Sequence, residues 1–109
     1  MTSAELETAV RLGVGIKVLV LQNGLYGTIA MHQAASRRSV SACDISAVDI
    51  AGLSRALGAH RIESDDESSL QDAATELMRH DGPAVLVVRT NRDVIAPGRS
   101  LSALAVGAP

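Results

Sequence analysis

The chain has almost no aromatic side chains. Its 109 residues include one tyrosine and neither phenylalanine nor tryptophan. Alanine, valine, leucine and isoleucine must therefore form the core, and each buried aliphatic side chain contributes about 1.5–3 kcal/mol. Such a core can form, but it lacks large anchoring side chains, which suits a segment that packs on something else.

Other absences exclude whole classes of protein. The single cysteine, Cys43, rules out an internal disulfide and fits a reducing compartment. No apolar run reaches the roughly 18 residues of a membrane span. The net charge of −2 shows no excess of positive charge of the kind that binds nucleic acid. The pair Arg37-Arg38 is interpreted as part of a solvated loop. Because Met1 to Glu5 lacks the basic start and apolar core of a signal peptide, we expect one cytoplasmic domain.

Apolar periodicity predicts alternating helices and strands. Three helices are expected to begin at capping-box patterns: Thr2-x-x-Glu5 to Gly13, Ser46-x-x-Asp49 to Gly58, and Ser64-x-x-Glu67 to Gly82. A fourth, short helix is expected over residues 28–35. The predicted strands are residues 16–21, 60–63 and 84–88. The helix residues expected to face inward are Leu6, Ala9, Val10, Ile50, Leu53, Leu57, Leu70, Ala73, Ala74 and Leu77.

This order of elements indicates an α/β fold with a partial doubly wound parallel sheet, in which three strands have flanking helices. One middle strand with two edge strands would leave long rows of unpaired backbone groups. The pattern therefore predicts half of a larger sheet. We assign residues 1–97 to this domain and expect residues 98–109, where the pattern is weak, to form a loosely ordered tail.

The first predicted strand runs directly into Gln22-Asn23-Gly24. Ligands of open α/β sheets collect just beyond the carboxyl ends of such strands, and the neutral side-chain carbonyl of Asn23 can bind a hard cation. Read alone, Asn23-Gly24 is more simply interpreted as a turn dipeptide. The residues themselves leave both interpretations open.

The wider passage resembles one family. Its residues are Glu5-Leu-Glu-Thr-Ala-Val-Arg11, the strand with Asn23, and Tyr26-Gly-Thr-Ile29. They are similar to the second half of the diphosphate-binding domain of thiamine-diphosphate enzymes, near the acetolactate synthase and benzoylformate decarboxylase branch. The similarity continues through residues 49–59 and 82–89, to about Pro97.

The resemblance implies a set of binding residues. In the family, an earlier Gly-Asp-Gly signature binds magnesium through its aspartate, and this chain is similar to the part that starts a few residues later. Gln22 replaces the first residue of the family's Asn-Asn pair, whereas Asn23 matches the second. The resemblance thus implies Mg²⁺ binding by the Asn23 side chain and the Leu25 main-chain carbonyl. The implied cofactor-binding positions are Asn23, Gly24, Leu25, Tyr26 and Gly27.

The resemblance also implies a function. The chain would be a fragment or split subunit of a thiamine-diphosphate- and magnesium-dependent 2-keto acid decarboxylase or carboligase, and it would bind both cofactors only with a complementary subunit. The family's proton-relay glutamate belongs to a separate domain, so no catalytic residue is assigned. The alternatives are an inactive remnant and a cofactor-free α/β interaction module that associates with itself or with a partner through exposed sheet edges. A receiver domain is disfavoured, because its strand-end acidic pair and late-strand lysine are missing.

The remaining polar residues have simpler interpretations. His32 could face a substrate pocket, although a lone histidine on a short helix is more often solvated. His60 and His80 are expected to be isolated, without a partner at ligand spacing. Asp65-Asp66-Glu67 is interpreted as an acidic helix start that complements the macrodipole, rather than as a metal cluster.

Overall fold

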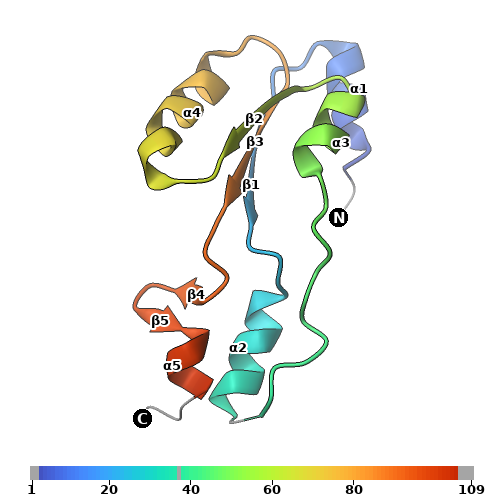
Figure 1. Cartoon of the computed structure of the whole chain (residues 1–109). Coiled ribbons are helices and arrows are strands. Elements are labelled where there is room, and N and C mark those ends of the chain that lie inside the picture. The colour runs from blue at the N-terminus through green and yellow to red at the C-terminus, as the bar shows by residue number, and fades with distance from the viewer. Residues whose placement is uncertain (1–2, 37, 106–109) are drawn as a thin grey trace. The chain divides into compact units, whose positions relative to one another are not determined.

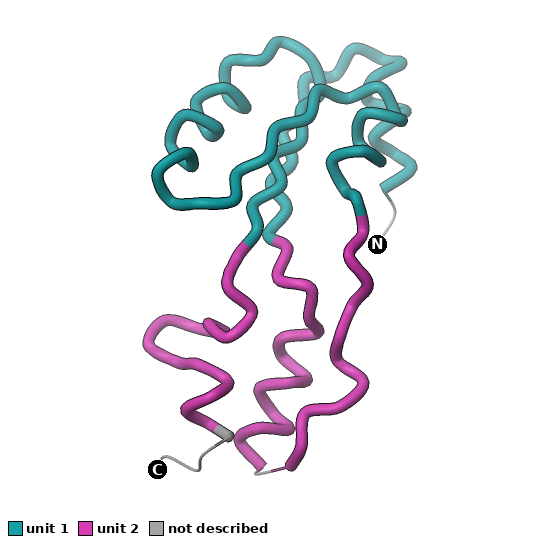
Figure 2. The backbone as a smooth tube through the Cα atoms, viewed as in Figure 1, with its two compact units in different colours: residues 1–21, 49–89 teal, residues 22–48, 90–109 magenta. Residues whose placement is uncertain are grey.

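The computed structural model describes residues 3–36 and 38–105 of the chain. The chain divides into two compact units, shown in Figure 2. Unit 1 contains residues 1–21 and 49–89, and unit 2 contains residues 22–48 and 90–109.

Unit 1 is built on a three-stranded sheet (Figure 1). Its elements are α1 (Glu5–Leu12), β1 (Lys17–Gln22), α3 (Ile50–Ala56), β2 (His60–Ser64), α4 (Glu67–Arg79) and β3 (Ala84–Arg89). The strand order is β1-β3-β2, and β2 pairs with β3 in parallel, with His60 opposite Ala84. On the other side of β3, the Ala84 N–H donates to Ile16 and the Thr90 N–H donates to Gln22. This arrangement confirms the predicted parallel sheet with flanking helices.

Helices cover both faces of this sheet (Figure 1). On one face, Ala73 and Leu77 of α4 pack against β2 and β3, where Leu86 is almost fully buried. On the other face, α1 and α3 pack against side chains that include Val85 and Val87 of β3. The core of unit 1 therefore centres on β3, whose first four residues are buried.

The expected end of α1 is confirmed, but its expected cap is not. Gly13 follows the helix with a φ of +68°, the left-handed conformation that favours glycine at a helix end. Thr2, the expected capping residue, lies outside the described residues. Ala4 occupies the N-cap position, and no side chain caps the helix there.

The other two predicted capping boxes are wrong. The Asp49 carboxylate, not Ser46, caps α3 by accepting from the Gly52 N–H at 2.8 Å. The Asp66 carboxylate caps α4 by accepting from the Ser69 N–H at 2.9 Å. Ser64 instead ends β2 and is buried. In both cases an aspartate nearer the helix supplies the oxygen that the first free N–H groups require.

The inward faces of the helices are only partly as predicted. Ala9 of α1 is buried and its neighbours Leu6 and Val10 pack against the core, as expected. In α3 the buried residues are Ala51 and Ser54, and the predicted Leu53 is exposed. In α4, the described side chains of Leu70 and Ala74 are exposed as well. The buried face of α3 is therefore formed by two small residues, Ala51 and Ser54.

Unit 2 contains α2 (Gly27–Ala35), β4 (Val94–Ala96), β5 (Arg99–Ser100) and α5 (Leu101–Ala105). Its core is a small cluster of Leu25, Ala30 and Cys43, with Leu101 packed against it. The predicted loose tail thus contains β5 and α5 up to Ala105, whereas residues 106–109 lie outside the described residues. Asp93 holds this segment, since its carboxylate accepts from the N–H and hydroxyl of Ser102. Polar contacts of this kind leave no apolar period in the sequence.

All of these helices are short. The longest, α4, has 13 residues. Within the parts of the chain that the structure describes, no helix has the length and apolar character needed to cross a membrane.

Candidate functional site

Asn23 follows β1 and forms a tight turn with the two residues after it. Its side-chain Oδ1 accepts a hydrogen bond from the Leu25 N–H at 3.1 Å. Gly24, between them, has a φ of +70°, a conformation that L side chains rarely adopt. The turn interpretation of Asn23-Gly24 is therefore correct for the local conformation, and the turn holds the side-chain oxygen of Asn23 in a defined place.

The same turn is bound to a second segment of unit 2. The Tyr26 N–H donates to the Cys43 carbonyl at 2.8 Å, and the Ile45 N–H donates to the Gly24 carbonyl at 2.9 Å. These two bonds flank an antiparallel bridge between Leu25 and Asp44. In such a pair the residue at the centre directs its own N–H and C=O away from the opposite segment.

The consequence concerns the two oxygens that sequence analysis singled out. The Leu25 N–H points away from Asp44 and meets Asn23 Oδ1. Because N–H and C=O of an extended residue point to the same side, the Leu25 carbonyl is directed toward the side on which Asn23 Oδ1 lies. The local fold thus turns both oxygens toward one side of the turn.

The first turn of α2 lies beside this arrangement. The helix begins at Gly27 directly after Tyr26, no side chain caps it, and its first turn contains no acidic residue. The first intrahelical bond runs from the Ala30 N–H to the Tyr26 carbonyl at 3.0 Å. The amides of residues 27–29 therefore have no intrahelical acceptor, and such a helix start favours an anion.

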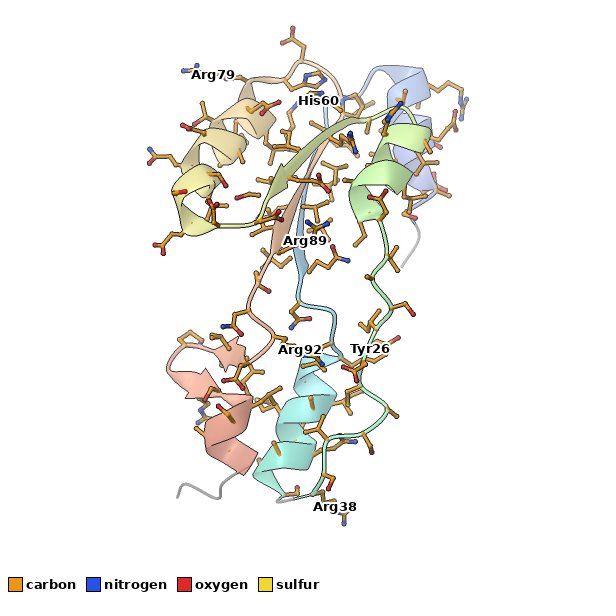
Figure 3. All side chains as sticks on the ribbon, viewed as in Figure 1. Tyr26, Arg38, His60, Arg79, Arg89 and Arg92 are labelled. Atoms are coloured by element: carbon orange, nitrogen blue, oxygen red, sulfur yellow. The ribbon has the colours of Figure 1, made fainter. Side chains whose placement is uncertain are left out.

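A shallow pocket of about 260 Å³ opens at this helix start. It is lined by Leu25, Tyr26, Gly27, Thr28 and Ile29. Three of the five predicted cofactor-binding residues therefore line one pocket, while Asn23 and Gly24 form the turn that leads into it. Tyr26 marks the place in Figure 3.

Thr28 and Ile29 were missed by sequence analysis. The sequence placed the start of this helix at Thr28, whereas it begins one residue earlier, at Gly27. A helix that starts at Gly27 has Thr28 and Ile29 in its first turn. The sequence did not show the exact start of this helix, because no capping side chain marks it.

The pocket rests on contacts within unit 2. Leu25, whose backbone forms the turn, buries its side chain against Ala30 and Cys43. Gln33 of α2 binds Ser41 through both side-chain atoms, accepting from its N–H at 3.0 Å and donating to its carbonyl at 3.3 Å. Cys43 is almost fully buried beside Gln33. These contacts hold the segment that positions Leu25.

The donor chemistry of the turn fits a hard cation in part. An amide oxygen and a main-chain carbonyl are oxygen ligands, which Mg²⁺ prefers, although both are neutral. The carboxylate of Asp44 is paired with Arg92. In the described part of the chain, no group of three or more histidine, cysteine, aspartate or glutamate side chains could hold a metal ion. The turn therefore has two neutral oxygens of the kind that Mg²⁺ prefers, which is fewer than a complete coordination shell requires.

The histidines differ from expectation. His60 and His80 are not isolated, because their rings stack with centroids 4.3 Å apart. His60 Nε2 also lies 2.8 Å from Glu76 Oε1. The prediction failed because the connection from α4 to β3 brings residues 20 positions apart to one place. His32 is exposed on α2 and does not line the pocket at its start.

Unit 1 contains a second pocket of about 250 Å³, which is almost wholly apolar. It lies among α1, β1 and α3, and its lining includes Leu6, Val18, Val20, Leu53 and Leu57. Leu53 and Leu57, both expected in the core, thus border this pocket. Its polar lining residues are Ser3, Glu5 and Ser54.

The chain is similar to known proteins over most of its length. Residues 1–88 match the family model described as "Thiamine pyrophosphate enzyme, C-terminal TPP binding domain". The chain is also 30% identical over 87 residues to the acetolactate synthase of Bacillus subtilis (strain 168). That alignment covers 80% of this chain and 15% of the relative, so the chain spans a small part of the relative's length.

Proposed function

Because the chain belongs to the thiamine pyrophosphate enzymes, within their C-terminal TPP binding domain, we propose that it supplies one side of a magnesium–diphosphate site. In this proposal it acts as a fragment or split subunit of a 2-keto acid decarboxylase or carboligase of the acetolactate-synthase type. A complementary polypeptide, carrying the Gly-Asp-Gly signature, supplies the other side. The single buried cysteine supports a reducing compartment, and we place the protein in the cytoplasm.

The observation that carries the proposal is the turn at the end of β1. Asn23 Oδ1 is held by the Leu25 N–H, and the backbone pairing with Asp44 turns the Leu25 carbonyl to the same side. We assign Mg²⁺ to these two oxygens. Magnesium usually combines few protein ligands with phosphate oxygens and water, so two ligands from one chain suit such a site.

The start of α2 would receive the diphosphate. The uncapped amides of Gly27, Thr28 and Ile29 lie at the N-terminal end of the helix, where negative charge is favoured. Gly27 lies next to the turn, since a Cβ built at this position would be in ordinary contact with Asn23 Nδ2, at 3.5 Å. Tyr26, more than half exposed, would border the same site.

When bound, thiamine diphosphate supplies the reactive carbon and the electron sink for reactions of 2-keto acids. This chain's residues would bind and orient it, and we assign none of them to proton transfer. Asn23 and the Leu25 carbonyl are neutral and do not offset the cost of dehydrating Mg²⁺. We therefore expect the isolated chain to bind thiamine diphosphate with magnesium weakly or not at all, and to catalyse nothing.

Isothermal titration tests the site directly. Thiamine diphosphate and Mg²⁺ are titrated into the chain alone, and into the chain mixed with a polypeptide bearing the Gly-Asp-Gly half. We expect binding only in the mixture, and we expect Asn23→Ala to abolish it. Asn91→Ala is the matched control, because Asn91 Oδ1 makes a similar turn by accepting from the Asp93 N–H at 2.9 Å.

Each outcome bears on the proposal. Micromolar binding by the isolated chain would contradict the shared site. Equal loss of binding in Asn23→Ala and Asn91→Ala would assign the effect to the stability of unit 2 rather than to the metal ligand. Binding in the mixture that survives Asn23→Ala would remove Asn23 from the site.

A second candidate is a cofactor-free α/β interaction module. The observation that favours it is in unit 1, where β1 exposes the apolar side chains of Leu19 and Leu21. In this version the chain associates with itself or with a partner through a sheet edge, and the family resemblance reflects an inactive remnant. Self-association or partner binding that does not change when thiamine diphosphate and magnesium are added would support it.

A further inference from the structure

The charge of the chain is divided unevenly between its two units. Unit 1 contains six lysine or arginine residues and ten aspartate or glutamate residues, a formal net charge of −4. Unit 2 contains four arginines and two aspartates, a formal net charge of +2. The pocket at the start of α2 belongs to unit 2 and is lined by neutral residues. An anion bound there therefore lies in the positively charged unit, although no lining residue supplies a charge.

One arginine of unit 2 lies beside this pocket. Arg92 forms an ion pair with Asp44, which is directly opposite Leu25 in the antiparallel bridge. The Cα atoms of such a pair are about 4.5 Å apart, and α2 begins two residues after Leu25. Figure 3 shows Arg92 near Tyr26 at the start of this helix, and Arg38 near its other end. Arg92 is thus a cation held next to the turn that leads into α2.

The second aspartate of unit 2 has other partners. The Asp93 carboxylate accepts from the Ser102 N–H at 2.9 Å and from its hydroxyl at 2.8 Å. The Asp93 carbonyl accepts from the Leu101 N–H at 2.8 Å. These bonds hold the backbone directly after Arg92. In the described part of the chain, Asp44 is the carboxylate that pairs with the Arg92 side chain.

The ion pair between Arg92 and Asp44 is open to exchange. The two side chains are 58% and 80% exposed, and an exposed ion pair contributes little to stability because water screens it. A diphosphate carries more negative charge than one carboxylate, and a guanidinium can bind phosphate oxygens through two parallel hydrogen bonds. Rotation about the bonds of the long arginine side chain should carry its guanidinium to a phosphate at the start of α2.

We propose that Arg92 is a diphosphate-binding residue that exchanges Asp44 for the ligand. While the site is empty, Asp44 keeps the guanidinium beside it. When a diphosphate binds at the first turn of α2, Arg92 supplies the positive charge that the neutral oxygens of Asn23 and Leu25 lack. This inference rests on the proposed function, because it takes the start of α2 as the place that receives the diphosphate.

An NMR titration of the whole chain tests the exchange without any substitution. Inorganic diphosphate is added at constant ionic strength, without Mg²⁺ and without a second polypeptide. We expect weak binding, in which the amides of residues 27–29, the Arg92 Nε–H and the Asp44 carboxyl carbon shift along one saturation curve. Shifts of the amides without those of Arg92 and Asp44 would overturn the proposal, and so would the absence of any shift.

Three variants measure the contribution of the guanidinium. Arg92→Ala should weaken diphosphate binding by about tenfold or more, since it removes hydrogen bonds between charged groups. Arg92→Lys should lie between this variant and the unchanged chain, because it keeps the charge but loses the planar fork. Arg38→Ala is the matched control, as it removes the same charge from the other end of α2. Equal weakening by Arg92→Ala and Arg38→Ala would assign the effect to net charge and contradict the proposal.

Asp44 separates a binding role from a structural one. If the ion pair only stabilised unit 2, Asp44→Asn and Arg92→Ala would both weaken binding. We instead expect Asp44→Asn to tighten it, because this change frees the guanidinium, and we expect the double variant to lose that gain. Unchanged protection of the Tyr26 and Ile45 amides would show that the bridge is intact in each variant. Weaker binding by Asp44→Asn, or a gain that persists fully without Arg92, would overturn the proposal.

The two proposals fail separately. If the mixture with the Gly-Asp-Gly polypeptide does not bind thiamine diphosphate with Mg²⁺, the shared magnesium site fails, whereas the titration of the chain with diphosphate alone still decides the role of Arg92. If that mixture binds, and Asn23→Ala abolishes binding while Arg92→Ala leaves it unchanged, the magnesium site stands and Arg92 is removed from it.

Discussion

Each of the two units is stabilised internally by a different kind of contact. Unit 1 has a central strand, β3, with apolar layers on both faces. Unit 2 has a small apolar cluster around Leu25, and hydrogen bonds from turns and side chains hold the rest. Periodic apolar packing gives unit 1 its stability, whereas the polar turns of unit 2 fix the positions of single atoms. The candidate site lies in the second kind of structure.

The largest effect should come from the centre of unit 1. Leu86→Ala in β3 removes a side chain that is almost fully buried, and should lower the free energy of unfolding by about 2–5 kcal/mol. Denaturant unfolding followed by circular dichroism measures the loss. Leu19→Ala, at an exposed position, should change it by less than about 0.5 kcal/mol. Similar losses in both variants would contradict the central role of β3.

Leu25→Ala tests whether unit 2 depends on its small cluster. We expect a loss of about 2 kcal/mol, at the low end for a buried leucine, because few side chains surround it. Hydrogen exchange should speed up at the Tyr26 and Ile45 amides, which bond to Cys43 and Gly24. The amides of β3 should keep their protection. Equal acceleration throughout β3 would mean that the two units unfold together.

Helix capping offers a finer comparison between pattern and structure. Asp49→Ala should lower the free energy of unfolding by about 1 kcal/mol, because it removes the acceptor of the Gly52 N–H. Ser46→Ala, at the cap that the sequence pattern predicted, should leave stability unchanged. Urea midpoints of the two variants decide between the caps, and a larger shift for Ser46→Ala would reverse the assignment.

The smallest effect concerns Asp66. Its pKa lies below the ordinary value of 3.8, chiefly because the Ser69 backbone N–H donates to the carboxylate, with the Ser68 and Ser69 hydroxyls adding to this. The folded state therefore favours the ionised form. This contribution to stability is present above the ordinary pKa and is lost as the pH falls through the lowered one.

An NMR titration of the side-chain carbon should detect this lowered pKa. Asp66→Asn should make stability less dependent on pH in the acid range, and it should remove the contribution that ionised Asp66 makes at neutral pH. A midpoint at or above 3.8 for Asp66 would contradict the capping geometry.

The sheet could be predicted from the sequence because its strands are apolar runs and the helices between them end at glycines. The strand ending in Leu21 and the turn at Asn23-Gly24 could be located in this way, and the family resemblance marked Leu25 as a second oxygen donor. The bridge from Leu25 to Asp44 could not, because residues 19 positions apart carry no shared period. Nor could the stack of His60 on His80, which depends on how α4 returns to the sheet.

Helix faces were harder to predict than helices. Leu53 follows an apolar pattern but is exposed, whereas Ala51 and Ser54 are the buried residues of α3. The elements of the last segment left no apolar signal, since the hydrogen bonds of Asp93 to Ser102 hold them. Where polar side chains set a boundary, hydrophobic periodicity carries too little information to find it.

The lack of aromatic residues has a spectroscopic consequence. Tyr26 is the only aromatic residue of the 109, so the near-ultraviolet emission of the chain comes from one side chain. That side chain is 55% exposed and lines the pocket at the start of α2. The protein therefore carries a built-in optical reporter of its candidate site, free of background from any tryptophan and readable without a label.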